Sequence, residues 1–275
     1  MKKSIYILLA ILSLASCTKI IDIELNSAMQ RIVIEARITD QGSPAMVYLS
    51  RTTDYFNPAE PEKVTGAKVS ISTDFGQSVN LVEMSKGVYQ YSDLSLKNGE
   101  TYHLSVEDGD QVYEAISVLP NKVLIDSLVI DWFDSFNPND SLSGGYILNC
   151  WYTDPVMLEN FYMFTAEKLN KSDVPELDFP GSMLKILSSD VLYNGKSALM
   201  NLNRRGFYQF GDTVLVELIS IDQNTYNYLD QLGEVSGGGP SFGNSAPANP
   251  ENNISNGAMG YFSAEAIDSR VVVIK

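Results

Sequence analysis

The stretch Leu94–Val106, LSLKNGETYHLSV, decides the fold class of this chain. Its second half alternates apolar and polar residues, which places Tyr102, Leu104 and Val106 on one face of a predicted strand and the residues between them on the other face. Such an alternation is typical of a strand that buries one face in a core and exposes the other face to water. The stretch therefore predicts a half-buried β-strand.

Leu96, Gly99 and Tyr102 lie at positions i, i+3 and i+6 of this stretch. This spacing resembles the Leu-x-Pro-Gly-x-x-Tyr corner of fibronectin type III domains and related β-sandwiches. In such corners the tyrosine hydroxyl bonds back to the backbone and holds the crossover between the two sheets. The resemblance implies that Tyr102 has a structural role and is not part of a binding site.

Strand patterns recur on both sides of this corner, and turn residues separate them. The segment Asp108-Gly109-Asp110, for example, is a strong hairpin signal between two of the patterns. About seven strands fit between residues 30 and 119 at this spacing. That number is close to the number in an immunoglobulin domain, so we expect residues 28–120 to form an immunoglobulin- or fibronectin-like β-sandwich.

Pro120 and Asn121 mark the predicted junction to a second domain over residues 121–275, mainly β with one helix. The helix pattern lies in DQNTYNYLDQLGEV, where Asp222 is a predicted N-cap and Gly233 a predicted end. Residues 236–257 are rich in Gly, Asn, Ser and Pro and are too polar to form a helix or strand. The chain then closes with two predicted strands, MGYFSAEAI and RVVVI.

The N-terminus has the features of a secretory signal. Two lysines precede an apolar run over residues 4–14, which is too short to span a bilayer of about 20 residues. Leu14-Ala15-Ser16-Cys17 then resembles the lipobox of bacterial lipoproteins. The resemblance implies that residues 1–16 are a signal peptide, that Cys17 is acylated and that residues 17–27 are a tether from the outer membrane. It leaves open whether the protein faces the periplasm or the cell surface.

Composition excludes one class of partner and favours a binding protein over an enzyme. The formal net charge of −15 repels nucleic acid and anionic headgroups. A single histidine, His103, excludes the common His-rich metal sites. Ser241 lies in GPSFG, a Gly-x-Ser-x-Gly match, but it lacks the preceding strand and following helix that such a nucleophile needs. We therefore expect no catalytic residue, no metal and no cofactor.

Two further positions carry specific expectations. With Cys17 acylated, Cys150 is the only remaining thiol, which excludes an intrachain disulfide and favours a buried apolar role for Cys150. The polar loop DSFNPNDSLSGG offers the oxygen ligands that calcium takes, although its spacing fits no EF-hand. Calcium binding there stays open. The loop ligands would be Asp134, Asn137, Asn139 and Asp140.

Aromatic residues near loops are the stronger indication of function, because flat apolar rings with polar edges bind sugars or proteins when they face outward. The alternative is that these rings belong to the core. The candidates are Tyr55, Phe56, Trp132, Phe136 and Trp151. A C-terminal motif is a second candidate, as a turn-rich plug docked on the second domain. It comprises Asn249, Pro250, Asn253 and Gly260, with Tyr261 and Phe262 as its anchors.

Taken whole, the chain resembles the lipoprotein family known as domain of unknown function 4249. The segments that carry the resemblance are the lipobox with IDIE after it, IVIEARITD, GAKVSI, GVYQYSDLSLKNGETYHLSV, ISIDQNTYNYLDQL and NPENNISNGAMGYFSA. The resemblance implies an outer-envelope lipoprotein that works with a TonB-dependent transporter, as a non-catalytic binding or accessory subunit. A lipid-anchored glycan-active hydrolase and a structural adhesin-like module are the alternatives.

Overall fold

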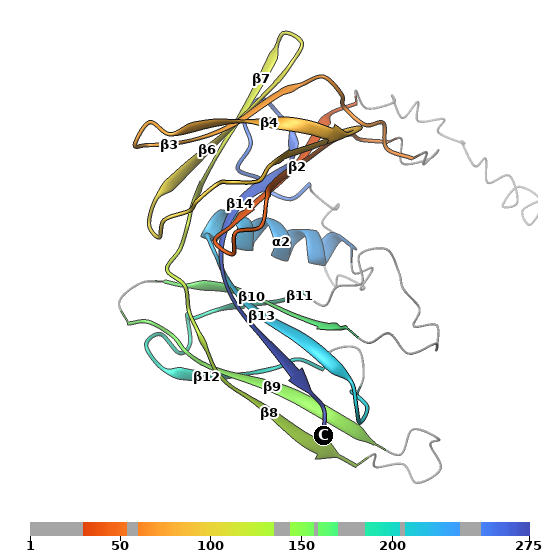
Figure 1. The fold of residues 1–275 in the computed structure, drawn as a ribbon, viewed down its shortest axis with the longest axis vertical. Coiled ribbons are helices and arrows are strands. Elements are labelled where there is room, and N and C mark those ends of the chain that lie inside the picture. The colour runs from red at the N-terminus through yellow and green to blue at the C-terminus, as the bar shows by residue number, and fades with distance from the viewer. Residues whose placement is uncertain are drawn as a thin grey trace, which may run out of the picture.

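The computed structural model describes residues 30–53, 60–134, 144–156, 159–169, 185–203, 207–236 and 249–275. Within these ranges the chain forms fourteen strands and one helix, and is therefore mainly β, as the sequence predicts. The strands build two β-sandwiches, one above the other in Figure 1.

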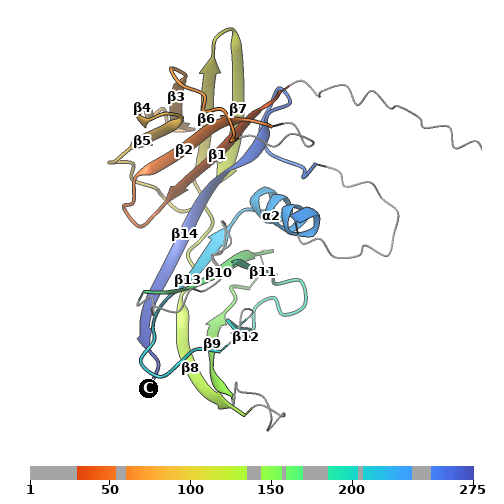
Figure 2. The same cartoon turned by 90° about the vertical axis from the view of Figure 1, so that its right-hand side faces the viewer.

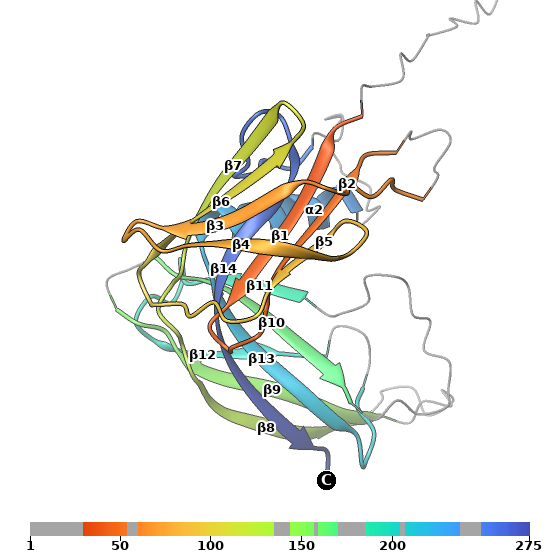
Figure 3. The same cartoon turned by 45° about the horizontal axis from the view of Figure 1, so that its top comes forward.

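The first sandwich contains the seven strands expected before residue 120. They are β1 (Ile32–Thr39), β2 (Ala45–Arg51), β3 (Lys68–Thr73), β4 (Ser78–Ser85), β5 (Val88–Tyr91), β6 (Thr101–Asp108) and β7 (Gln111–Val118). One layer has the order β1-β2-β5 and the other has the order β4-β3-β6-β7, with β4 also paired to β5. In Figure 3, β3 and β4 cross the direction of β1 and β2. This arrangement of three strands on four is that of an immunoglobulin- or fibronectin-like sandwich.

The corner before β6 has the structure that its spacing predicts. The backbone N–H of Lys97 donates to the Tyr102 hydroxyl at 2.8 Å, and this hydroxyl donates to the Glu100 carboxylate at 2.9 Å. Tyr102 is fully buried, and burial raises its pKa to about 12. Gly99, at a φ of 75°, donates its N–H to the Leu119 carbonyl, which joins the corner to the end of β7. Tyr102 is thus a structural residue.

The second sandwich also consists of two layers. Its strands are β8 (Ile125–Phe133), β9 (Gly145–Thr153), β10 (Phe161–Lys168), β11 (Lys185–Ser189), β12 (Ser197–Asn201) and β13 (Thr213–Ile221). A three-stranded sheet β12-β9-β8 packs on the strands β11-β10-β13, and a core with several aromatic rings fills the space between them. In this core the Tyr152 ring lies 5.3 Å from the ring of Tyr162 and 5.1 Å from that of Phe164.

Strand β14 (Met259–Val273) belongs to both sandwiches. Residues 259–265 pair in parallel with β1, and residues 266–273 pair antiparallel with β13. Figure 2 shows the strand running without a break from the upper sandwich into the lower one. Its even-numbered side chains face the first core in one half of the strand and the second core in the other half. Phe262 and Ala264 lie in the first core, and Val272 packs on the second core. The first half of β14 therefore completes the sheet of a sandwich that begins more than 200 residues earlier.

The sequence prediction of two separate closing strands is wrong, because the residues between them do not form a turn. Asp268 stays in the extended strand, and its carboxylate accepts the backbone N–H of Ile125 at the start of β8. Arg270 donates to the carbonyl of the same residue. Both polar side chains thus have partners on β8, which is why they are compatible with a continuous strand.

The single described helix, α2 (Gln223–Ser236), covers the side of the second sandwich that faces away from its core. Asp222 caps it as predicted, since its carboxylate accepts the Thr225 N–H at 2.8 Å. The helix packs on a cluster that includes Ile219 and Ile267. The predicted end at Gly233 is wrong, because the helix continues through this glycine to Ser236.

Polar contacts fix the junction of the two sandwiches. Ser117, near the end of β7, accepts the Ala264 N–H through its hydroxyl oxygen and donates to the cap residue Asp222. Asp40, after β1, accepts the Ile267 N–H at 3.0 Å and forms a 2.8 Å ion pair with Lys122 of the linker. The division of the chain at residue 120 stays a prediction, and these contacts show how the two sides are joined.

Replacing Tyr102 by phenylalanine will destabilise the fold by about 1–3 kcal/mol, because the Lys97 N–H loses its buried acceptor. The pKa of Tyr102 is higher in the folded chain than its ordinary value of 10, so folding favours the neutral phenol. The stabilisation that the Tyr102 hydroxyl provides is therefore complete below pH 10 and is lost as the pH rises toward 12. Urea unfolding at several pH values measures both effects. The control is Tyr113→Phe, since Tyr113 is half-buried in the same core and no hydrogen bond of its hydroxyl is seen among the described residues. An equal loss in both variants would contradict the role of the corner.

Alanine at Gly260 will disrupt the first sandwich, because a Cβ there would lie 2.0 Å from the Ile34 carbonyl oxygen. The control is Gly257→Ala, because Gly257 also has a positive φ, 71° against 103° at Gly260, but no atom lies within 4 Å of the added Cβ. We expect Gly257→Ala to cost about 1–2 kcal/mol from backbone strain alone. Gly260→Ala should cost several times more or prevent folding. Equal unfolding free energies of the two variants would show that close approach of β14 to β1 is unimportant.

Candidate functional site

The sheet β12-β9-β8 has one side in the core and one side open to solvent, which we call the outer face. Side chains at paired positions of neighbouring strands point to the same side of a sheet. Cys150 of β9 pairs with Leu128 and Met200 on the core side, and its neighbour Trp151 pairs with Leu199 on the opposite side. The residues of the outer face that matter below are Asp131, Phe133, Asn149, Trp151, Leu199 and Asn201.

A chain of side-chain hydrogen bonds crosses the outer face from one edge strand to the other. Asn201 of β12 donates to the Asn149 carbonyl oxygen at 2.9 Å, and Asn149 of β9 donates to the Asp131 carboxylate of β8 at 3.3 Å. Asn149 is 7% exposed, whereas Asp131 and Asn201 are exposed at the two ends. The central amide is therefore held in a fixed orientation, and its two neighbours present polar groups to solvent.

Trp151 lies on the outer face next to this chain of hydrogen bonds. It is 39% exposed and lies beside Leu199, which is 49% exposed. Trp132, the other tryptophan, lies on the opposite side of the sheet, at the end of β8. Its ring packs edge-on against Tyr146 with 5.0 Å between centroids, and its indole N–H donates to Asp134. The structure thus separates two residues that the sequence grouped together.

Two phenylalanine rings form the far end of the outer face. Phe133 stacks on Phe207 with 5.4 Å between centroids and 19° between planes. Gly145 makes this possible, because a Cβ at that position would lie 2.3 Å from the Phe207 side chain. Gly145 and Trp151 are six residues apart on β9, so about 20 Å separates the two aromatic ends of the face.

The three strands of this sheet contain no Lys, Arg or His. Their only charged residues are Asp126 and Asp131 in β8. Asp126 accepts the Thr153 hydroxyl, so its charge is already hydrogen-bonded within the sheet. These three strands therefore carry only negative charge, and the exposed groups named on their outer side are aromatic rings, a leucine, an amide and a carboxylate.

Of the remaining candidates, only the C-terminal motif is described throughout. It contacts β7 of the first sandwich as well as α2 of the second domain, where the Glu251 N–H donates to the Gln231 side chain at 2.8 Å. The Asn253 amide donates to the carbonyl oxygens of Ile116 and Phe262 and accepts the Phe262 N–H. Phe262 is fully buried in the first core. Asn249 and Pro250 precede this contact, while Tyr261 packs on the α2 residue Tyr228 with 5.1 Å between centroids.

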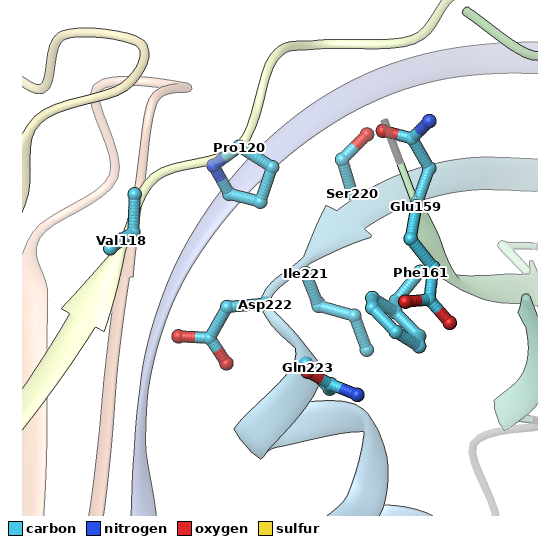
Figure 4. A pocket seen from close by; sticks show the side chains of 9 residues that line it. Val118, Pro120, Glu159, Phe161, Ser220, Ile221, Asp222 and Gln223 are labelled. Atoms are coloured by element: carbon cyan, nitrogen blue, oxygen red, sulfur yellow. The ribbon is translucent and has the colours of Figure 1, made fainter. Parts of the chain in front are cut away.

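A cavity of about 280 Å³ lies between the two sandwiches (Figure 4). It is lined by the end of β7, the linker at Pro120, the start of β10 and the residues before α2. Its two acidic residues are Asp222 and the exposed Glu159. Both carboxylate oxygens of Asp222 are already bonded, one to Ser117 and one to the Thr225 N–H. The buried Ser220 hydroxyl has no partner among the described residues. Asp222 is therefore held by the chain itself, and Glu159 is the carboxylate of this cavity that is open to solvent.

Arg37, which is partly exposed, and the buried Glu265 form an ion pair on the side of β14 that faces away from both cores. Their Nε and Oε2 atoms are 2.5 Å apart, and Glu265 is 1% exposed. Burial raises the pKa of Glu265, while Arg37 acts against this shift. The pair lies where β14 passes from one sandwich to the other, so its geometry serves the junction.

Several residues named in the sequence analysis lie outside the described ranges, and the described residues form no metal site. No group of three or more His, Cys, Asp and Glu side chains that could hold a metal occurs among the described residues. His103 is paired with the Asp74 carboxylate at 2.6 Å near the surface. In the same ranges, no helix has the length and apolarity to cross a membrane. The predicted residues outside the description are Cys17, Tyr55, Phe56, Phe136, Asn137, Asn139, Asp140 and Ser241.

Sequence reasoning found Trp151 but missed the residues around it. Asn149 and Trp151 alternate in β9, so their common face was visible as a pattern. Asp131 and Asn201 belong to other strands, and only the pairing register brings them next to Asn149. No pattern within one strand sets these two registers, because residues 134–144 separate β8 from β9 and residues 154–196 separate β9 from β12.

Comparisons with known proteins identify a family for this chain. The model of a family described as Domain of unknown function (DUF4249) matches residues 18–270. No curated protein matches the chain. A two-domain fibronectin type III segment of chicken tenascin is 9% identical, with 89% of this chain and 99% of that one covered and a TM-score of 0.22. A chain of a cytokine receptor complex is 8% identical, with 87% and 94% covered and a TM-score of 0.26. Both scores are low, and neither likeness bears on function.

Cys150 will resist alkylation in the folded protein. Its thiol is fully buried, and burial, together with Asp126 and Asp268, raises its pKa to about 12. A Cys17→Ala chain isolates this thiol, and mass spectrometry after iodoacetamide treatment at mildly alkaline pH measures the reaction. We expect no adduct in native buffer and complete modification in denaturing urea. Rapid modification of the native protein would show that the sheet β12-β9-β8 opens.

Proposed function

The chain belongs to the family described as Domain of unknown function (DUF4249), and we propose that it is a non-catalytic, lipid-anchored binding protein of the outer membrane that serves as an accessory subunit of a TonB-dependent uptake system. The observation that carries this proposal is the outer face of the sheet β12-β9-β8. It presents a partly exposed indole beside a fixed row of polar side chains, and no group of side chains that could hold a metal occurs among the described residues. Such a surface, with an aromatic ring and a few placed polar groups, is suited to binding a molecule.

The outer face lies far from the start of the described chain. The described chain enters β1 at the top of Figure 1, whereas β8, β9 and β12 lie at the bottom. The junction contacts of Ser117, Asp40 and Lys122 hold the two sandwiches together, so a molecule bound at the outer face would lie at the opposite end of the described structure from the start of β1.

The lipid anchor and the transporter are the parts of the proposal that derive from the lipobox and the family resemblance. Acyl chains on Cys17 contribute about 0.8 kcal/mol per buried methylene, and several chains together give stable attachment. The strongly acidic charge fits a role in the envelope that requires no contact with nucleic acid. A transporter partner would receive the molecule that the outer face binds.

Affinity purification from detergent-solubilised envelopes tests this function. A full-length chain with a C-terminal tag should recover a large β-barrel transporter, and the protein should remain with the membrane fraction. The control is Cys17→Ala, which should move the protein to the soluble fraction because the acylated thiol is gone. Membrane attachment of the Cys17→Ala chain would contradict the anchor. Failure of the wild-type chain to recover a transporter would contradict the accessory role, and turnover of glycans by the pure protein would favour a hydrolase.

A further inference from the structure

We infer that the outer face binds a neutral oligosaccharide chain, laid over Trp151 and the Asn201–Asn149–Asp131 row. The inference rests on the proposed function in one respect: it names the molecule that such a binding protein would hold. It commits to uncharged sugars and not to a protein partner, and four features of the face lead to this choice.

The first feature is the indole. Trp151 shows 39% of its surface although its strand lies in the middle of the sheet. The apolar face of a sugar ring can cover such a flat aromatic surface while the hydroxyl groups at its edge remain hydrogen-bonded. Leu199 on the neighbouring strand extends the apolar area to one side of the indole.

The second feature is the row of polar side chains. Hydrogen bonds inside the row fix Asn149, so only its ends are available to a ligand. Asp131 on β8 offers carboxylate acceptors, and the Asn201 amide on β12 offers a donor. These two strands are about 10 Å apart across the sheet, because β9 lies between them. Sugar hydroxyls donate and accept hydrogen bonds, and they can therefore satisfy both ends at once.

The third feature is charge. A phosphate, sulfate or carboxylate group only accepts hydrogen bonds, and it needs cations or N–H donors. The three strands carry no Lys, Arg or His, and Asp131 would repel an anion. These strands therefore offer no cation to acidic polysaccharides, phospholipid headgroups or nucleic acids.

The fourth feature is length. The Phe133–Phe207 stack lies about 20 Å along β9 from Trp151, and the polar row lies between these aromatic ends. A single small molecule would contact one end only. A chain of several sugar rings can contact both, which favours an oligosaccharide over a monosaccharide.

Affinity electrophoresis and calorimetry with soluble galactomannan, xyloglucan and mixed-linkage glucan test the inference on the purified full chain. Polygalacturonate and chondroitin sulfate are the anionic comparison. We expect at least one neutral polymer to bind and neither anionic polymer to bind. Trp151→Ala should weaken that binding by about tenfold, since truncation of a central aromatic residue removes much of the contact.

The matched control is Trp132→Ala, because Trp132 is even more exposed, at 54%, but lies on the other side of the same sheet. We expect it to leave binding within about twofold of wild type. Circular dichroism and thermal unfolding of both variants check that each is folded. If Trp151→Ala does not fold, Asn201→Ala provides the second variant, since Asn201 is exposed at the end of the row.

Three results would overturn the inference: no binding of any of the three neutral polymers, preference for an anionic polymer, or equal losses in the Trp151 and Trp132 variants. These results are separate from a failure of the proposed function. Transporter recovery by the Trp151→Ala chain should equal that of wild type. Recovery without sugar binding would refute only the ligand class, and sugar binding without recovery would refute only the accessory role.

Discussion

The rest of the structure depends on the backbone pairing of β14. One extended segment forms hydrogen bonds with β1 over its first half and with β13 over its second half. Because successive side chains of a strand point to opposite sides, its even-numbered residues fill two cores in turn. Gly260 permits the close approach to β1, since any side chain there would meet the Ile34 carbonyl. The last strand of the chain thus fixes both sandwiches and their relative position.

The outer face depends on this strand indirectly. Asp268 and Arg270 of β14 bond to the backbone of Ile125, which fixes where β8 begins. The start of β8 sets its register on β9, with an irregularity next to Ile125 that shifts the following residues. That register places Asp131 beside Asn149. A slip of one residue would turn Asp131 into the core and remove the polar row from the surface.

The junction and the outer face use polar groups in different ways. At the junction, Ser117 and Glu265 are buried and their partners Asp222 and Arg37 are partly exposed, and the hydrogen bonds of all four are directed at other parts of the chain. Such groups fix the geometry of the junction and leave few free hydrogen-bond donors or acceptors for a ligand. On the outer face, the row of side chains ends in exposed groups. This difference is the physical reason to place binding on the sheet and not in the cavity between the sandwiches.

The sequence by itself determined the local structure. Patterns among neighbouring residues predicted the alternation around Tyr102, the strands before residue 120, the cap at Asp222 and the burial of Cys150. These features depend on period-two patterns and on hydrogen bonds between residues close in the chain. Only the tertiary structure decided that two predicted strands are one, that the C-terminal motif contacts β7, and that Asp131, Asn149 and Asn201 form a row beside Trp151. Each of these depends on the pairing of segments far apart in the sequence, and side-chain patterns within one strand carry no information about which distant strand lies next to it or in which register.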